Sequence, residues 1–229
     1  MNLQGAAAVV TGASLGIGLA VSEALVARGA RVCGLARNAQ RLTDVATRLG
    51  AAFIAQPCDV GHAAQVRSAM RAAHERLGAI DIVVNNAGIG LFGAVDQMPE
   101  EQWEALLATN LSGTYHCIRE VVPTMKAQGR GHIVNIASIA ALVGYAQASA
   151  YNATKFAVRG LSDALSKELA PAGIKVTALF PGTTETAFGN RTPSAAAILQ
   201  PADVADAVLH VLERPDRCLV SEMVLRPFP

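Results

Sequence analysis

Apolar runs of strand length alternate along the chain with segments whose apolar residues recur at helical spacing. The first run, residues 6–10, is continuously apolar, which is typical of a parallel strand that is covered on both faces. Alternation of strands with helices favours right-handed crossovers, and therefore a parallel, doubly wound sheet flanked by helices. The pattern predicts seven strands, at residues 6–10, 31–36, 51–55, 80–84, 132–136, 175–180 and 218–220.

Between the strands, apolar residues recur every three or four positions, so each such segment predicts a helix with one buried face. Pro201 is placed to open the last of these helices, and Glu100 and Glu101 suit the positive end of another. We expect Pro123 to bend or shorten the long helix that follows Pro99. The apolar stripes are Ile17, Val21 and Leu25; Leu42, Val45 and Leu49; Val66, Met70, Ala73 and Leu77; and Val204, Val208 and Val211.

Composition is consistent with one globular unit and excludes two classes of partner. Neither a linker nor an internal repeat divides the sequence, so we expect a single domain over residues 1–229. Hydrophobic residues make up 52% of the sequence, which is enough for a sizeable core. Because 19 Lys and Arg nearly balance 18 Asp and Glu, no basic face argues for a nucleic-acid partner or for a polybasic membrane anchor.

Residues 131–154 contain no Asp, Glu, Lys or Arg, which raises the question of a membrane span. Polar residues interrupt this stretch too often for lipid, so we expect no membrane segment. The amino terminus has no charged region before an apolar core, so we expect no cleaved signal and a cytoplasmic protein. Neither a metal site nor a disulfide framework is indicated by the spacing of the cysteines, Cys33, Cys58, Cys117 and Cys218.

A glycine-rich stretch separates the first predicted strand from the first predicted helix, and it reads Thr11-Gly-Ala-Ser-Leu-Gly-Ile-Gly18. Glycines at such a junction let the backbone turn sharply, approach a ligand closely and direct the free N–H groups of a helix start at a pyrophosphate. We therefore expect an anion-binding loop here. From the glycines alone, a tight turn that binds nothing is the alternative.

Tyr151 and Lys155 lie four residues apart at the start of a predicted helix, which places the phenol and the ammonium group on one face. A phenol has an unperturbed pKa of about 10, and a neighbouring ammonium favours the phenolate, as proton transfer at a carbonyl requires. The alternative is an exposed tyrosine that covers the lysine stem. Ser138 follows another predicted strand, and ligands bind beyond the carboxyl ends of strands in such sheets.

The order and spacing of the motifs resemble the short-chain dehydrogenase/reductase family over nearly the whole chain. The motifs are TGASLGIG at 11–18, NNAG at 85–88, Asn110, Ser138, YNATK at 151–155 and Pro181-Gly182. The resemblance implies a Rossmann-type fold and hydride transfer between a nicotinamide cofactor and a carbonyl or alcohol.

The resemblance also implies a role for each of four residues. Tyr151 would be the general acid in reduction and the base in oxidation, and Ser138 would hydrogen-bond the substrate oxygen. Lys155 would lower the pKa of the tyrosine and bind the nicotinamide ribose. Asn110 would hold a water molecule that links the lysine to solvent; a solvated helical asparagine is the alternative.

Arg37 ends the second predicted strand, where an NAD-binding protein typically places Asp or Glu. A guanidinium there favours the 2′-phosphate of NADP over NAD; a solvated surface arginine is the alternative. By resemblance, Asp59 would contact the adenine, and a threonine after Gly182 would contact the nicotinamide carboxamide and the phosphates. The cofactor-binding residues implied in this way are Gly12, Ser14, Leu15, Gly16, Ile17, Gly18, Arg37, Asp59, Val60, Asn86, Ala87, Gly88, Tyr151, Lys155, Pro181, Gly182, Thr184 and Thr186.

Two positions depart from the family pattern. Leu15 stands where the family often has Ser, Arg or Lys, so it offers no side-chain contact to a phosphate. Residues 224–229 lack the glycine-rich ending that is frequent in the family. This second departure puts the corresponding subunit contacts in doubt, although the resemblance implies a homodimer or homotetramer that pairs through the helices near 100–125 and 150–170.

Residues 183–200 form a long irregular segment after the sixth predicted strand, and we expect them to act as a substrate lid. The expected function is NADP-dependent oxidation or reduction of a carbonyl/secondary alcohol pair, with an apolar ketone or 3-oxoacyl compound preferred over a free sugar. The alternatives are a catalytically inactive cofactor-sensing protein and a sugar epimerase or dehydratase. Apolar side chains expected around the substrate are Ile89, Leu91, Phe92, Val143, Tyr145, Phe188, Ile198 and Leu199, with Gly189 and Pro193 giving mobility and Arg191 a charge.

Overall fold

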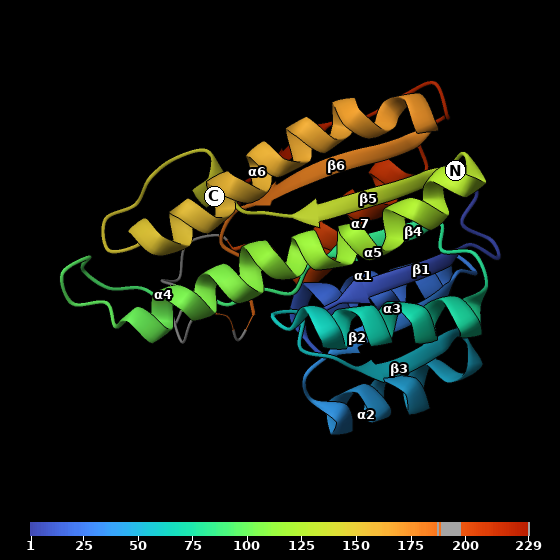
Figure 1. Cartoon of the computed structure of the whole chain (residues 1–229), viewed down its shortest axis with the longest axis horizontal. Helices are drawn as coiled ribbons and strands as arrows, with labels where there is room; N and C mark the ends of the chain where they lie inside the picture. Colours follow the sequence, from blue (N-terminus) through green and yellow to red (C-terminus); the bar gives the residue numbers. More distant parts are fainter. Residues whose placement is uncertain (187, 189–197, 229) are drawn as a thin grey trace.

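A seven-stranded parallel sheet forms the centre of the computed structural model, which describes residues 1–186, 188 and 198–228. The strand order is β3-β2-β1-β4-β5-β6-β7, so the chain winds outward from β1 in both directions, as the sequence pattern predicts (Figure 1). The strands are β1 (Ala7–Thr11), β2 (Arg31–Ala36), β3 (Phe53–Pro57), β4 (Ile82–Asn85), β5 (Gly131–Ile136), β6 (Ile174–Pro181) and β7 (Glu222–Leu225).

Helices cover both faces of the sheet. On one face lie α3, α5 and α6, and on the other lie α1, α2 and α7 (Figure 1). All four predicted apolar stripes fall on these helices, and the capping box of Gln200 and Asp203 starts α7 at Pro201. The bounds are α1 (Gly16–Ala27), α2 (Ala39–Leu49), α3 (Ala63–Leu77), α4 (Glu100–Leu106), α5 (Gly113–Gln128), α6 (Ser149–Leu169) and α7 (Pro201–Leu212).

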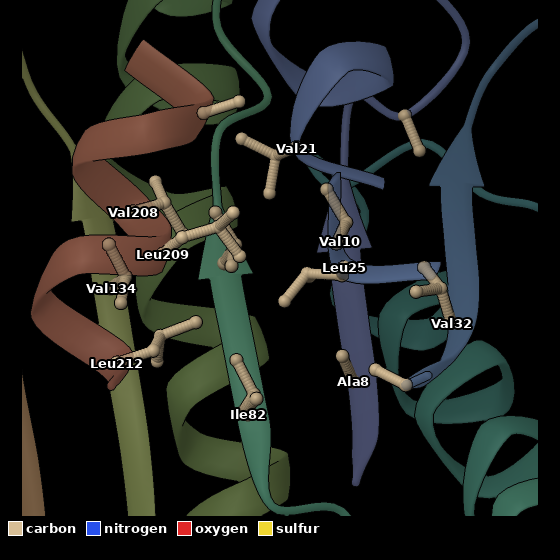
Figure 2. Packing of buried hydrophobic residues seen from close by; sticks show 14 of the residues in the cluster. Ala8, Val10, Val21, Leu25, Val32, Ile82, Val134, Val208, Leu209 and Leu212 are labelled. Atoms are coloured by element: carbon tan, nitrogen blue, oxygen red, sulfur yellow. The ribbon is translucent and has the colours of Figure 1, made fainter. Parts of the chain in front are cut away.

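The core explains why residues 7–10 of β1 are all apolar. Figure 2 shows Val10 of β1 on the face where α1 and α7 pack, beside Val21 and Leu25 of α1. Val9 points to the opposite face and joins the cluster under α3 and α5. Because successive side chains of a strand alternate between faces, a strand that is covered on both sides needs an apolar residue at each position.

The seventh strand lies at Glu222–Leu225, so the prediction of a strand at 218–220 is wrong. The carbonyls of Cys218 and Val220 accept from the side chains of Lys175 and Thr177, and the parallel ladder begins at the pairing of Ala178 with Glu222. As the last strand of the sheet, β7 alternates between exposed and half-buried positions. It therefore lacks the continuous apolar run that identified the other strands.

The strand predicted at 51–55 is displaced by two residues, because residues 50–52 form a 3₁₀ turn before β3. Pro123 does not shorten its helix, since α5 continues to Gln128 and ends where Gly129 adopts a left-handed conformation (φ 65°). Burial of Val121 and Met125 against the sheet holds the helix on both sides of the proline. The interruption lies instead at a π-helical turn, Leu107–Ser112, between α4 and α5.

No helix among the described residues is both long enough and apolar enough to cross a membrane. The uncharged residues 131–154 form β5, a short 3₁₀ turn and the first residues of α6. Three of the four cysteines are buried as free thiols; they are Cys33, Cys58 and Cys117.

Candidate active site

A cleft of about 1580 Å³ opens at the carboxyl ends of the strands. It is lined by residues that follow β1, β2, β4, β5 and β6, and by the first turn of α6. Nearly all residues that the sequence nominated line this cleft, including Ser138, Tyr151 and Lys155. Gly18 and Asn110 do not line it; each supports residues that do.

The glycine-rich loop is shaped so that its backbone faces the cleft. Gly12 and Gly16 have positive φ angles of 67° and 56°. At Gly18 a Cβ would lie 2.3 Å from the carbonyl oxygen of Gly12, so no larger residue fits there. Leu15 is the N-cap of α1, and its side chain makes no capping hydrogen bond. The first-turn N–H groups of α1 therefore have no side-chain acceptor and can meet an anion.

Asn86 ties the glycine-rich loop to the end of β4. Its Nδ2 donates to the carbonyl oxygen of Thr11 at 3.0 Å, and the backbone N–H groups of Asn86 and Ala87 both donate to Thr11 Oγ1 at 2.9 Å. These contacts fasten the ends of β1 and β4 to each other. The motif at 11–18 includes Thr11, but its spacing indicates no role for the hydroxyl; a hydroxyl at the end of a buried apolar strand is a usable signal for one.

Tyr151 and Lys155 are buried side by side on α6, with 8% and 5% of their surface exposed. Lys155 Nζ lies 5.8 Å from the centroid of the Tyr151 ring and donates to the carbonyl oxygen of Ile136 at 3.2 Å. Ser138 lies at the end of β5, where its Oγ accepts from the N–H of Ala140 at 3.1 Å. Burial at both positions excludes the alternative of an exposed tyrosine that covers a lysine stem.

The ionisation of this pair differs from the expectation that Lys155 lowers the pKa of the tyrosine. Burial raises the pKa of Tyr151 to about 12, and a side-chain hydrogen bond with Ser138 opposes that rise. Burial also lowers the pKa of Lys155 to about 8. Desolvation is therefore the main influence on the pKa of both groups, and at neutral pH the phenol is protonated.

Asn110 is held on the π-helical turn and is buried. Its Oδ1 accepts from the N–H of Ile89 at 2.8 Å, and its Nδ2 donates to the carbonyl oxygen of Ile89 at 3.0 Å and to Thr154 Oγ1 at 3.2 Å. A Cβ at Gly88 would lie 3.3 Å from Asn110 Oδ1 and 3.7 Å from Lys155 Nζ. These contacts exclude a solvated helical asparagine and place Gly88 between Asn110 and Lys155.

Two arginines line the cleft at the end of β2. Arg37 follows the strand, and Arg41 lies in the first turn of α2, where Asn38 Oδ1 accepts from the N–H of Arg41 at 2.9 Å. Within the described ranges neither guanidinium is held in an ion pair. Arg41 was missed, although its place one helical turn after Arg37 was visible in the sequence.

Apolar side chains surround Tyr151 at the other end of the cleft. The ring centroid of Tyr151 lies 5.4 Å from that of Phe92 and 5.8 Å from that of Phe188. The structure corrects the expectation for three residues, because Val143, which is 41% exposed, and Ile198 and Leu199 do not line the cleft. Other lining residues here are Ile89, Leu91, Tyr145 and two that the sequence analysis missed, Gln102 and Gln147.

Much of the predicted lid falls outside the described residues, including Gly189, Arg191 and Pro193. Of the described part, Leu199 pairs with the chain that leaves β6: its N–H donates to the carbonyl oxygen of Thr183 at 2.9 Å. All three threonines that could contact a cofactor, Thr183, Thr184 and Thr186, line the cleft.

Comparison with known sequences identifies one protein family, and the match includes the residues that line the cleft. The family model described as short chain dehydrogenase matches residues 6–196. An uncharacterized oxidoreductase of Staphylococcus saprophyticus subsp. saprophyticus is 38% identical over 232 residues, covering 99% of both chains. The matched range contains every candidate site residue from Gly12 to Thr186.

The chain also resembles solved structures of a dehydrogenase and a reductase. The closed form of a serine dehydrogenase complexed with NADP⁺ superposes with a TM-score of 0.91 and 30% identity, over 96% of this chain and 94% of that one. A 3-ketoacyl-(acyl-carrier-protein) reductase from Brucella melitensis, complexed with NADH, superposes with a TM-score of 0.91 and 30% identity, over 97% and 96% of the two chains.

Proposed function

Because the chain belongs to the short-chain dehydrogenase/reductase family, we propose that it is an NADP-dependent oxidoreductase acting on a ketone/secondary alcohol pair. The observation that carries the proposal is the buried pair of Tyr151 and Lys155, which opens onto the same cleft as Ser138 and the glycine-rich loop. Absorbance of NADPH, followed over ketones, 3-oxoacyl thioesters and sugars, tests it; no turnover of any carbonyl compound would contradict it.

The residues present fit a dinucleotide. A pyrophosphate needs N–H donors and close backbone approach, which the uncapped start of α1 and the glycines at 12 and 16 supply. Lys155 would bind the nicotinamide ribose, and a threonine after Gly182 would bind the carboxamide. When bound, the nicotinamide ring supplies or accepts the hydride.

The chain's own residues would manage the proton and the developing charge. Tyr151 is protonated at neutral pH, so it is in the form that donates a proton to a carbonyl oxygen during reduction. Ser138 would hold that oxygen by a hydrogen bond. The ammonium of Lys155 would stabilise the phenolate that remains, and its pKa of about 8 leaves it mostly charged at pH 7.

The preference for NADP rests on the charge at the end of β2. Arg37 and Arg41 present two guanidinium groups to the cleft, and neither is neutralised by a carboxylate of the described part of the chain. A 2′-phosphate carries negative charge and accepts hydrogen bonds in the fork geometry that guanidinium offers. The complex of the Brucella melitensis relative contains NADH, so likeness to relatives alone does not decide between the two cofactors.

We expect Arg37→Asp to reverse the cofactor preference. The substitution removes a cation beside the 2′-phosphate and supplies an acceptor for the ribose hydroxyl of NAD, so NADPH affinity should fall by roughly tenfold or more. Fluorescence titration of both reduced cofactors measures it. Arg71→Asp, on the exposed surface of α3, is the control and should leave both affinities unchanged. Equal or tighter binding of NADH by the wild type would contradict the assignment.

The aromatic lining supports an apolar substrate, as the sequence analysis predicted. Phe92 and Phe188 contact the ring of Tyr151 itself, so a substrate carbonyl at the phenol would have apolar surface on both sides. Apolar contact of this kind favours a medium-sized ketone or a 3-oxoacyl chain over a free sugar, whose hydroxyls would lose hydrogen bonds to water.

Phe188→Ala should raise KM for the best apolar ketone by roughly 5- to 30-fold, because truncating a contacting aromatic ring removes about 1–2 kcal/mol of contact. Initial rates at saturating NADPH measure it. A small ketone that does not reach Phe188 serves as the matched substrate, and its KM should change little. Higher kcat/KM for polar sugars than for every apolar ketone would contradict the apolar pocket.

A further inference from the structure

The segment between β5 and α6, residues 137–148, forms one wall of the substrate end of the cleft. It begins at Ala137 and Ser138, passes through a 3₁₀ turn and reaches α6 two residues before Tyr151. Tyr145, Gln147 and Ala148 line the cleft from this wall. Its position therefore decides how much room a substrate has beside the phenol.

Asn152 holds this wall from behind. Its side chain does not line the cleft and is buried, with 6% of its surface exposed. Nδ2 donates to the carbonyl oxygens of Ala140 at 2.7 Å and Val143 at 2.8 Å, and Oδ1 accepts from the N–H of Tyr145 at 3.2 Å. One amide thus satisfies three backbone groups along six residues of the wall. Losing it would leave the buried carbonyl of Ala140 and two partly buried backbone groups without this partner.

A second observation shows that the wall is held in a particular conformation. Gln147 has a φ of 61°, and no other non-glycine residue of the described chain has a positive φ. Its carbonyl oxygen accepts from the N–H of Gly93 at 2.8 Å, which ties the wall to the segment carrying Leu91 and Phe92. A strained residue persists only where its surroundings over-determine it, and such residues cluster at functional sites.

We propose that Asn152 is a positioning residue that sets substrate specificity by holding residues 140–147 at the cleft. It acts through Tyr145, whose N–H it holds and which lines the cleft together with Gln147, and it does not touch the reacting atoms. The inference rests on the proposed function for the identity of the substrate, but the pinning itself can be measured without turnover. In this view Asn152 determines which carbonyl compounds fit the cleft, while Tyr151, Ser138 and Lys155 determine the rate of the chemical step.

Asn152→Asp tests the pinning, because it keeps the size and one acceptor but removes both donors and sets a carboxylate against two carbonyl oxygens. Amide hydrogen exchange within 139–148 should become at least about tenfold faster, with the rest of α6 little changed. Ser162→Ala, a buried polar residue on the same helix that contacts Asn135 instead, is the matched control. Exchange in 139–148 equal to that of the control would overturn the proposal.

Steady-state kinetics distinguish a positioning role of Asn152 from a general loss of activity. With Asn152→Asp, KM for the best substrate should rise about tenfold, while kcat and the affinity for NADPH stay within about threefold of the wild type. Lowering the pH should reduce the KM ratio to the wild type, because a protonated carboxyl regains one donor. A fall in kcat with KM unchanged, or a pH-independent ratio, would overturn the proposal.

Asn152→Ala is the second variant should the aspartate variant fail to fold, and it should show the same faster exchange and higher KM without the pH dependence. If the wild type turns over no carbonyl compound, the proposed function fails, and hydrogen exchange still decides whether Asn152 holds the wall.

Discussion

Replacing Tyr151 by phenylalanine is expected to lower kcat by roughly 10²- to 10⁴-fold, the usual contribution of a positioned general acid. Only the hydroxyl is lost, and the ring contacts with Phe92 and Phe188 are kept. The affinity for NADPH should therefore stay within about twofold, since the loss falls on the transition state alone. Steady-state rates and a fluorescence titration of NADPH measure the two quantities on the same preparation.

Tyr115→Phe is the matched control, because Tyr115 is a half-exposed tyrosine on α5 that does not line the cleft. It should turn over the best substrate at the wild-type rate. Unchanged turnover by Tyr151→Phe would contradict the proposed proton transfer. A wild type that binds NADPH but turns over nothing would favour the cofactor-sensing alternative.

Lys155→Met should damage function in two ways at once. We expect kcat to fall by roughly 100-fold or more, because the ammonium no longer stabilises the phenolate of Tyr151. NADPH affinity should fall as well, since the proposed contact with the nicotinamide ribose is lost. A loss confined to kcat, with NADPH affinity unchanged, would contradict that contact.

The same substitution should make the protein more stable. Lys155 is buried, and its hydrogen-bond acceptor is a backbone carbonyl of Ile136, so its charge is incompletely compensated. The pKa of about 8 lies below the ordinary lysine value, so the charged form is disfavoured in the folded state. Methionine fills a similar volume without that cost, and the gain at pH 7 should be about 1–3 kcal/mol.

The pH dependence gives a sharper test. Below pH 8 the lysine is charged in both the folded and unfolded states, so the cost of burying its charge is fully present. Between about pH 8 and 10.5 the unfolded state binds more protons, so the stability of the wild type should rise relative to the variant and the difference should shrink. Urea unfolding at pH 7 and at pH 10 measures it, with Lys126→Met on α5 as control. A variant less stable than the wild type at pH 7 would contradict this account.

Much of the fold could be predicted because its interior strands are covered on both faces. Their continuous apolar runs are unambiguous, whereas β7 has one edge without a partner strand and alternates in burial, so its sequence resembled a loop. Pro123 does not shorten its helix, because packing of Val121 and Met125 on the sheet outweighs the local preference of proline.

Site residues could be predicted from the sequence where their spacing along the chain indicates their chemistry. They could not be predicted where their role depends on contacts between distant segments. The Tyr151 and Lys155 pair follows from helical geometry, but the direction of the tyrosine pKa depends on burial, which spacing does not reveal. The motif at 151–155 includes Asn152 but indicates no role for it, because its hydrogen-bond partners lie on a loop whose path the sequence does not reveal.

The π-helical turn makes chain length a functional constraint. A π turn spans one residue more than the α-helical pattern of hydrogen bonds, so deleting one residue between Trp103 and Gly113 would restore a regular helix. The segments on either side would keep their orientation, because the π turn absorbs its extra residue locally, but the residues within the turn would be redistributed around the helix axis. Asn110 lies in this turn, so it would lose its alignment with Ile89 even though Asn110 itself remained in the sequence. We therefore expect a one-residue deletion in this turn to damage the site more than a substitution at a position of the turn that makes no contact with the site.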